Sequence, residues 1–284
     1  MQESFCHLRA LMAYASNDAT NESSLYGAVS FILTLFCASA KVTATKFKNL
    51  CLGSFPQKVL RKSRSGKMFR ASDFTILVVQ STFNRQSTEG KINDMTPLIW
   101  EVKASPEMLT WFGERRSKER NLAEHFFQHI HQVVTRVTYA KAKFNKKPIY
   151  ALLSIDVWFI LLYFPGNPPS IVWNTGINGK PQLRAAEFPN LYKYIVVPPT
   201  RMFDEACTAF SPAFLYALQL SVEDLIDVSV TPHPFFHAPE GTAEWISEEV
   251  CHIHFDPPLN INRHLCTVEE AMVECKARGK RAAR

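Results

Sequence analysis

The sequence predicts an α/β protein in which helices flank a central mixed β-sheet. Two kinds of pattern support this prediction. Several short runs are rich in apolar and β-branched residues, as strands are, and two longer segments repeat apolar residues at helical spacing. The strand-like runs cover residues 74–79, 97–100, 147–154 and 157–163, and the helical patterns fall within 22–40 and 106–144. A proline-rich break at 165–169 ends this series.

The composition is that of a folded protein and disfavours several classes of enzyme. The chain has 284 residues, 46% of them hydrophobic and 12% aromatic, which is enough for one large domain or two modest ones. With only 10 glycines, it contains no phosphate-binding glycine loop, dinucleotide fingerprint or Gly-x-Ser-x-Gly elbow. The net charge of +6 permits a nucleic-acid partner without requiring one.

The first helix of the series is expected to begin near Glu22. Asn21 or Ser23 is a suitable N-cap. Apolar residues then recur at helical spacing, at Leu25, Val29, Ile32, Leu33 and Phe36. A carboxylate in the first turn favours the positive end of the helix dipole, and this common role is sufficient to explain Glu22.

A basic β-hairpin is expected next. Its arms are residues 57–62 and 67–70, and the turn at 63–66 contains Gly66. No acidic residue occurs from Lys41 to Ser72. The basic side chains that could contact the phosphates of a nucleic acid are Lys58, Arg61, Lys62, Arg64 and Lys67. Solvation of an exposed hairpin would explain the same charges.

Two acidic residues lie at the ends of strand-like runs. Asp73 comes directly before residues 74–79, and Glu101 directly follows 97–100. Because side chains alternate along a strand, Glu101 and Lys103 should share one face while Val102 points to the other. If the two strands are neighbours, two carboxylates and an ammonium group would surround one point. Such a point could hold a divalent metal ion and an attacking water.

Residues 106–144 are expected to form one or two helices after the second carboxylate. The longer helix would carry an apolar stripe, made by Leu122, Phe126, Ile130, Val133, Val134 and Val137. Gln128 and Gln132 are four residues apart and share a face. Two apolar strands, buried on both faces, should follow at 147–154 and 157–163, with a turn at Ile155 and Asp156.

An Asp, a variable gap and then Glu-x-Lys at a strand end resemble the PD-(D/E)xK nuclease superfamily, which has the restriction-endonuclease-like fold. The family core runs helix, strand, strand, strand, helix, strand (αβββαβ), and this sequence offers those elements in that order. The match could include a large and mostly uncharacterised fungal family of this superfamily. One departure is that the family usually has Pro directly before the Asp, where this chain has Ser72.

The resemblance implies metal-dependent hydrolysis of a phosphodiester bond in nucleic acid, most naturally DNA. Asp73 and Glu101 would hold Mg²⁺ or Mn²⁺, and Lys103 would orient or help to deprotonate the water. The family often has a further Glu on the first helix and a Gln on the later helix. Glu22 matches the former, as a third metal ligand, and Gln132, or else Gln128, matches the latter.

Two other interpretations stay open on the sequence alone. The chain could be a catalytically inactive protein of the nuclease fold that binds nucleic acid or another protein. Alternatively, Glu-Val-Lys could be the edge of an ordinary strand, in which case Asp73 and Glu101 would lie far apart. A zinc site made by Cys251, His254, His264 and Cys266 is a weaker alternative, because their spacing matches no standard finger.

The chain is expected to divide near its proline-rich break. Residues 1–165 would form the nuclease-like core, and 166–284 an acidic C-terminal extension or a small second subdomain with a basic tail. Seven scattered cysteines do not form a disulfide pattern, so an intracellular protein is expected. The tail, 276–284, could be a nuclear-import signal or a solvated end.

Overall fold

The computed structural model describes most of the chain, with gaps at several connections and at the C-terminal end. The described residues are 2–16, 21–44, 50–61, 69–80, 95–104, 119–143, 148–165, 173–175, 181–183, 191–204, 208–223, 225 and 227–255.

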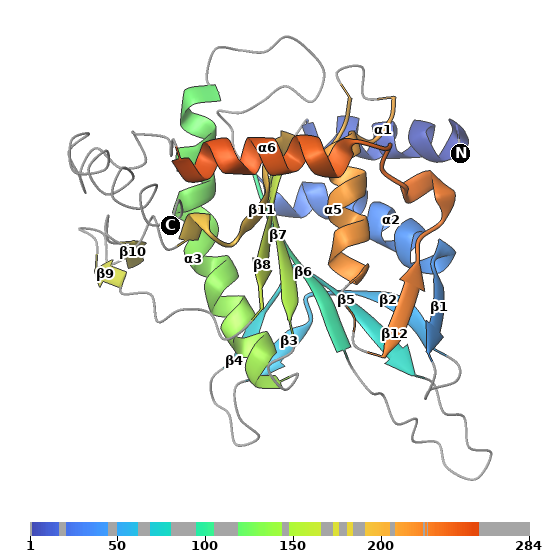
Figure 1. Ribbon diagram of the computed structural model, residues 1–284, viewed down its shortest axis with the longest axis horizontal. Coiled ribbons are helices and arrows are strands. Elements are labelled where there is room, and N and C mark those ends of the chain that lie inside the picture. The colour runs from blue at the N-terminus through green and yellow to red at the C-terminus, as the bar shows by residue number, and fades with distance from the viewer. Residues whose placement is uncertain are drawn as a thin grey trace.

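A mixed sheet of six strands forms the centre of the molecule (Figure 1). Its strands, in spatial order, are β11 (Ile195–Arg201), β8 (Trp158–Phe164), β7 (Ile149–Ile155), β6 (Met95–Lys103), β5 (Phe74–Gln80) and β2 (Leu50–Pro56). β6 and β7 are parallel, and all other neighbours are antiparallel. A parallel pair needs a long crossover connection. The chain from β6 to β7 contains α3 (Glu119–Lys143), so the predicted α/β class is confirmed.

Helices cover both faces of this sheet. α2 (Glu22–Ser39) and α5 (Pro212–Glu223) pack on one face, with α1 (Gln2–Ser16) packed against α2, while α3 packs on the other face (Figure 1). α6 (Thr242–Phe255) contacts β11 and α5. Five members of the apolar stripe predicted for the long helix are buried in α3 against its face of the sheet: Phe126, Ile130, Val133, Val134 and Val137. The side chain of the sixth, Leu122, lies outside the described residues.

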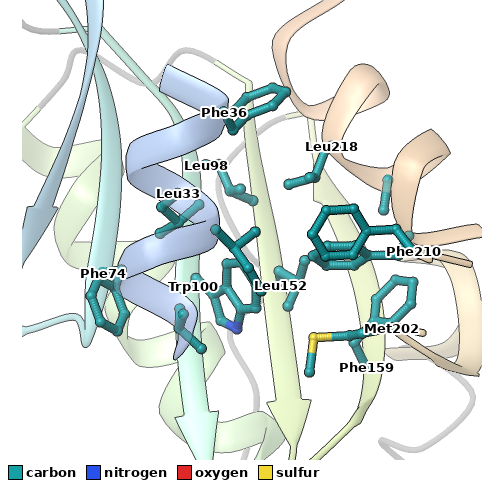
Figure 2. Packing of buried hydrophobic residues seen from close by; sticks show 14 of the residues in the cluster. Leu33, Phe36, Phe74, Leu98, Trp100, Leu152, Phe159, Met202, Phe210 and Leu218 are labelled. Carbon is teal, nitrogen blue, oxygen red and sulfur yellow. The ribbon is translucent and has the colours of Figure 1, made fainter. Parts of the chain in front are cut away.

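The alternation of side chains along β6 separates two hydrophobic clusters. Leu98, Trp100 and Val102 point toward α2 and α5, whereas Ile99 points toward α3. Figure 2 shows Trp100 and Leu152 packed among side chains of α2 and α5. Trp100 Nε1 donates a hydrogen bond of 2.8 Å to Ser154 Oγ of the neighbouring strand, so its one polar atom is satisfied in the core.

The base of the predicted basic hairpin lies within the described residues. It consists of β3 (Val59–Arg61) and β4 (Phe69–Ala71), which pair antiparallel, while residues 62–68 are outside the description. The prediction missed β2, which precedes the hairpin and pairs with β5. Gln57 separates β2 from β3 with a φ of +47°, a left-handed conformation that bends the strand pair.

Residues on both sides of the proline-rich break contribute to the same core. β11 forms an edge of the central sheet, and β12 (Val228–Thr231) pairs with β1 (Lys41–Ala44). The larger hydrophobic cluster joins side chains of α1 and α2 to side chains of α5 and α6. Three shorter elements also lie after the break: β9 (Trp173–Thr175) pairs with β10 (Pro181–Leu183), and η2 (Pro234–Phe236) is a 3₁₀ turn. The described elements β11, α5, β12 and α6, which follow residue 165, therefore share the core of the elements that precede it.

In the described part of the chain, one helix, α2, is long and apolar enough to cross a membrane by length and composition. Here it packs on the central sheet, and the side chains that it buries are Leu25, Ala28, Val29, Ile32, Leu33, Phe36 and Cys37. Within the described residues, Cys6, Cys37, Cys51 and Cys251 are free thiols. The basic tail lies outside the described residues.

Asn21 is the N-cap of α2, one of the two predicted candidates. Its Oδ1 accepts hydrogen bonds from the Ser23 backbone N–H at 3.1 Å and from Ser23 Oγ at 2.8 Å. Replacing Asn21 by alanine should lower the free energy of unfolding by about 1 kcal/mol, measured by urea denaturation. Asn21→Ser retains a capping oxygen and should stay close to wild type. Equal losses in both variants would contradict a capping role.

Candidate active site

The pairing of β5 with β6 places Asp73 opposite Glu101. Phe74 is paired with Trp100 in this antiparallel register. Asp73 directly precedes Phe74 and Glu101 directly follows Trp100, so continuing the register by one residue brings Asp73 opposite Glu101. Directly opposed residues have Cβ atoms about 4.5–5.5 Å apart. This neighbourhood excludes the interpretation in which Asp73 and Glu101 lie far apart. Like charges in opposed positions destabilise a sheet, so the pair requires a reason other than stability.

Asp73 is held by two hydrogen bonds that use both carboxylate oxygens. Tyr26 Oη of α2 donates to Oδ1 at 2.8 Å, and the Val102 backbone N–H donates to Oδ2 at 2.8 Å. Asp73 is 8% exposed. Burial, followed by the hydrogen bond to Asp73, raises the pKa of Tyr26 well above its usual range. Tyr26 therefore stays neutral and acts as a donor that orients Asp73.

Glu101 is completely buried between two cations. Its Oε1 is 3.1 Å from Lys103 Nζ and forms an ion pair with Arg136 Nη1. Neither of its carboxylate oxygens has a hydrogen-bond partner among the described residues. Burial, and then the charge of Asp73, raises the pKa of Glu101 to about 7, although Arg136 and Lys103 act in the opposite direction.

Lys103 connects Glu101 to the start of α2. Its Nζ donates to both Glu22 carboxylate oxygens at 3.0 Å, and its side chain is 6% exposed while that of Glu22 is 42% exposed. Burial lowers the pKa of Lys103, but the carboxylates of Glu101 and Glu22 outweigh that effect and raise it overall. Lys103 is therefore protonated and is suited to orient a water or an anion. The shared face predicted for Glu101 and Lys103 is confirmed by their contact.

Arg136 of α3 joins the site to the helix and to the neighbouring strand. Its Nε donates to the Ala71 carbonyl at 2.6 Å, and its Nη1 is 3.4 Å from Gln132 Oε1. Gln132 thus reaches the site through Arg136. The side chain of Gln128, the other predicted candidate, lies outside the described residues.

Sequence reasoning missed Tyr26 and Arg136. Each is four residues after a predicted site residue on the same helix: Tyr26 follows Glu22, and Arg136 follows Gln132. Residues four apart on a helix share a face, so both could have been found as neighbours once the first residue was suspected. Nothing in the sequence distinguishes them from ordinary exposed helix residues.

Ser72, the departure from the Pro of the resembled family, has a structural role. Its backbone N–H donates to the Lys58 carbonyl at 3.3 Å, and the Gln57 N–H donates to the Asp73 carbonyl at 2.8 Å. A proline at position 72 would lack the N–H for the first bond. These two backbone hydrogen bonds link the β2–β5 pair to the β3–β4 pair, so the hairpin begins directly beside Asp73.

Only part of the predicted nucleic-acid surface lies within the described residues. Lys58 is partly exposed, with its Nζ 4.9 Å from the centre of the Phe55 ring. The backbone of Arg61 belongs to β3, while its side chain and Lys62, Arg64 and Lys67 lie outside the description. The residues of the weaker zinc alternative are also only partly described. Cys251 is exposed on α6, whereas His264 and Cys266 lie outside the described residues.

The site offers the smallest number of protein carboxylates with which Mg²⁺ or Mn²⁺ is commonly bound. Magnesium is commonly bound by one or two protein carboxylates and keeps several waters. Asp73 and Glu101 provide such a pair, and the buried Glu101 Oε2 is an oxygen with no hydrogen-bond partner in the described part of the chain. No group of three or more His, Cys, Asp or Glu residues suited to a metal is found among the described residues. Glu22, the predicted third ligand, instead contacts Lys103.

Comparison of the chain with protein-family models, curated proteins and solved structures found no significant match.

Proposed function

We propose that this chain is a metal-dependent nuclease of the PD-(D/E)xK type that hydrolyses phosphodiester bonds in DNA. The observation that carries the proposal is the buried pair of opposed carboxylates, Asp73 and Glu101, with Lys103 beside it. Buried titratable groups of like charge are costly, and they cluster where chemistry requires them. The order α2, β2, β5, β6, α3, β7 is the order expected of the restriction-endonuclease-like core and supports the proposal.

The roles of the residues follow from the charge that develops during hydrolysis. Asp73, Glu101 and the Val102 carbonyl would hold the ion. A bound Mg²⁺ supplies positive charge that neutralises the phosphoryl and leaving oxygens. Tyr26 and the Val102 N–H keep Asp73 in place. Lys103, kept protonated by Glu22 and Glu101, orients the attacking water.

The hairpin β3–β4 is the proposed contact for the nucleic-acid backbone. It is joined to Asp73 by the backbone hydrogen bonds at Gln57 and Ser72. Basic side chains at such a place bind phosphates regardless of sequence, so affinity should fall steeply with salt. Lys58 is the described member of the set, and Arg61, Lys62, Arg64 and Lys67 are proposed with it.

Cleavage of plasmid DNA by the purified chain in Mg²⁺ tests the proposal. We expect Asp73→Ala and Glu101→Ala each to reduce the rate by about two to three orders of magnitude or more, the cost typical of losing charge stabilisation at a reacting centre. EDTA should stop the wild type. Glu248→Ala, on the exposed part of α6, is the matched control and should cleave normally. Cleavage that survives both site substitutions would show the assignment to be wrong.

A non-catalytic nucleic-acid-binding or protein-interaction module is the second candidate. One observation favours it: the Arg136 guanidinium already neutralises the carboxylate of Glu101. Calorimetry with Mg²⁺, comparing wild type with Glu101→Ala, separates the two functions. Metal-independent DNA binding without cleavage would support the module.

A further inference from the structure

Arg136 is a cation fixed inside the candidate active site by several contacts. It forms an ion pair with Glu101, donates to the Ala71 carbonyl at 2.6 Å and lies 3.4 Å from Gln132 Oε1. Its side chain is only 17% exposed. The planar fork of a guanidinium suits such a set of acceptors, whereas a lysine could not reach them in the same geometry.

Glu101 is held by ion pairs and not by hydrogen bonds. Its Oε1 forms ion pairs with Lys103 and Arg136, and neither of its carboxylate oxygens has a hydrogen-bond partner among the described residues. A buried carboxylate needs positive charge nearby, because burial removes its hydration. Lys103 is shared with Glu22 through both carboxylate oxygens. Arg136 is therefore the cation whose only ion pair in the described structure is with Glu101.

We infer that Arg136 acts as an internal counterion that competes with a divalent metal ion for Glu101. The inference rests on the proposed function, since it concerns the same site. In the metal-free protein the guanidinium takes over the neutralising role of the ion and holds Glu101 in place. When an ion binds, the positive charge of Arg136 opposes it, and the Arg136–Glu101 contact weakens.

The hydrogen bond from Arg136 to the Ala71 carbonyl connects this competition to the β3–β4 hairpin. Ala71 is the last residue of β4 and directly precedes Ser72 and Asp73. Arg136 thus ties α3 to both the acidic pair and the base of the hairpin. A metal ion that weakens the ion pair leaves Arg136 anchored at Ala71 and Gln132, beside the proposed path of the nucleic-acid backbone.

Titration of Mn²⁺ into the full chain by calorimetry tests the inference. Arg136→Gln removes the charge and should tighten Mn²⁺ binding by about tenfold or more, because like charges repel strongly where water is scarce. The same variant should melt at a lower temperature than wild type in EDTA and should gain more from added Mn²⁺. Lys41→Gln removes an exposed positive charge from β1, and it should change neither quantity.

A second variant keeps the test decisive if Arg136→Gln does not fold. Arg136→Lys retains the positive charge but lacks the fork that holds it beside Glu101. Its affinity for Mn²⁺ is expected to lie between that of wild type and that of Arg136→Gln. If the folded variants bound Mn²⁺ as tightly as wild type or more weakly, the proposed competition would be wrong, while the proposed function would stand. Absence of Mn²⁺ binding in wild type and in every variant would overturn the proposed function together with it.

Discussion

Replacing Lys103 by methionine is expected to lower the rate of Mg²⁺-dependent DNA cleavage by about two to four orders of magnitude, the usual contribution of a positioned proton donor or acceptor. The ammonium group lies 3.0 Å from both Glu22 oxygens and 3.1 Å from Glu101 Oε1, so methionine removes the hydrogen bonds while keeping a similar length of side chain. Because Lys103 is not a proposed ligand and its positive charge lies beside Glu101, metal binding should persist and should tighten, as expected for Arg136→Gln. Single-turnover cleavage and calorimetry measure the two quantities separately.

The control for this substitution is Lys41→Met, which removes an exposed lysine from β1. Its cleavage rate should match that of wild type. A Lys103→Met protein that still cleaves at the wild-type rate would remove Lys103 from the mechanism. Loss of both cleavage and metal binding would instead assign it to the structure of the site.

Replacing Glu101 by glutamine is expected to stabilise the metal-free protein increasingly as pH rises from about 4.5 to about 8. Burial raises the pKa of Glu101 from its ordinary 4.5 to about 7, so the folded state binds a proton that the unfolded state has lost. The stability that Glu101 contributes is thus complete below pH 4.5 and is lost as pH rises toward 7. A pKa unit corresponds to about 1.4 kcal/mol, so the unfolding free energy of the variant should gain about 3 kcal/mol over wild type across this interval.

Urea denaturation in EDTA at several pH values measures this difference. Glu248→Gln on the exposed part of α6 is the matched control, and its difference from wild type should stay constant with pH. If the difference between Glu101→Gln and wild type were independent of pH, the ion pairs with Lys103 and Arg136 would fully offset the burial of Glu101.

The local elements were largely predictable because their signals are local. Asn21 caps α2 as one of the two expected residues, and the predicted runs at 147–154 and 157–163 correspond to β7 and β8. The turn between them lies at Asp156 and Val157, one residue later than expected. The strand β2 was missed. Its residues carry little alternation, and only the bend at Gln57 separates it from the predicted hairpin.

By itself, the sequence determined that Glu101 and Lys103 share a face, because the period of a strand depends only on the backbone. It also determined that Glu22 begins a capped helix. Only the tertiary structure decided that Asp73 faces Glu101, since strand register depends on which residues of two distant segments pair. The same is true of Tyr26 and Arg136: their side chains became part of the site through the docking of α2 and α3 on the sheet, and no pattern within either helix encodes that position.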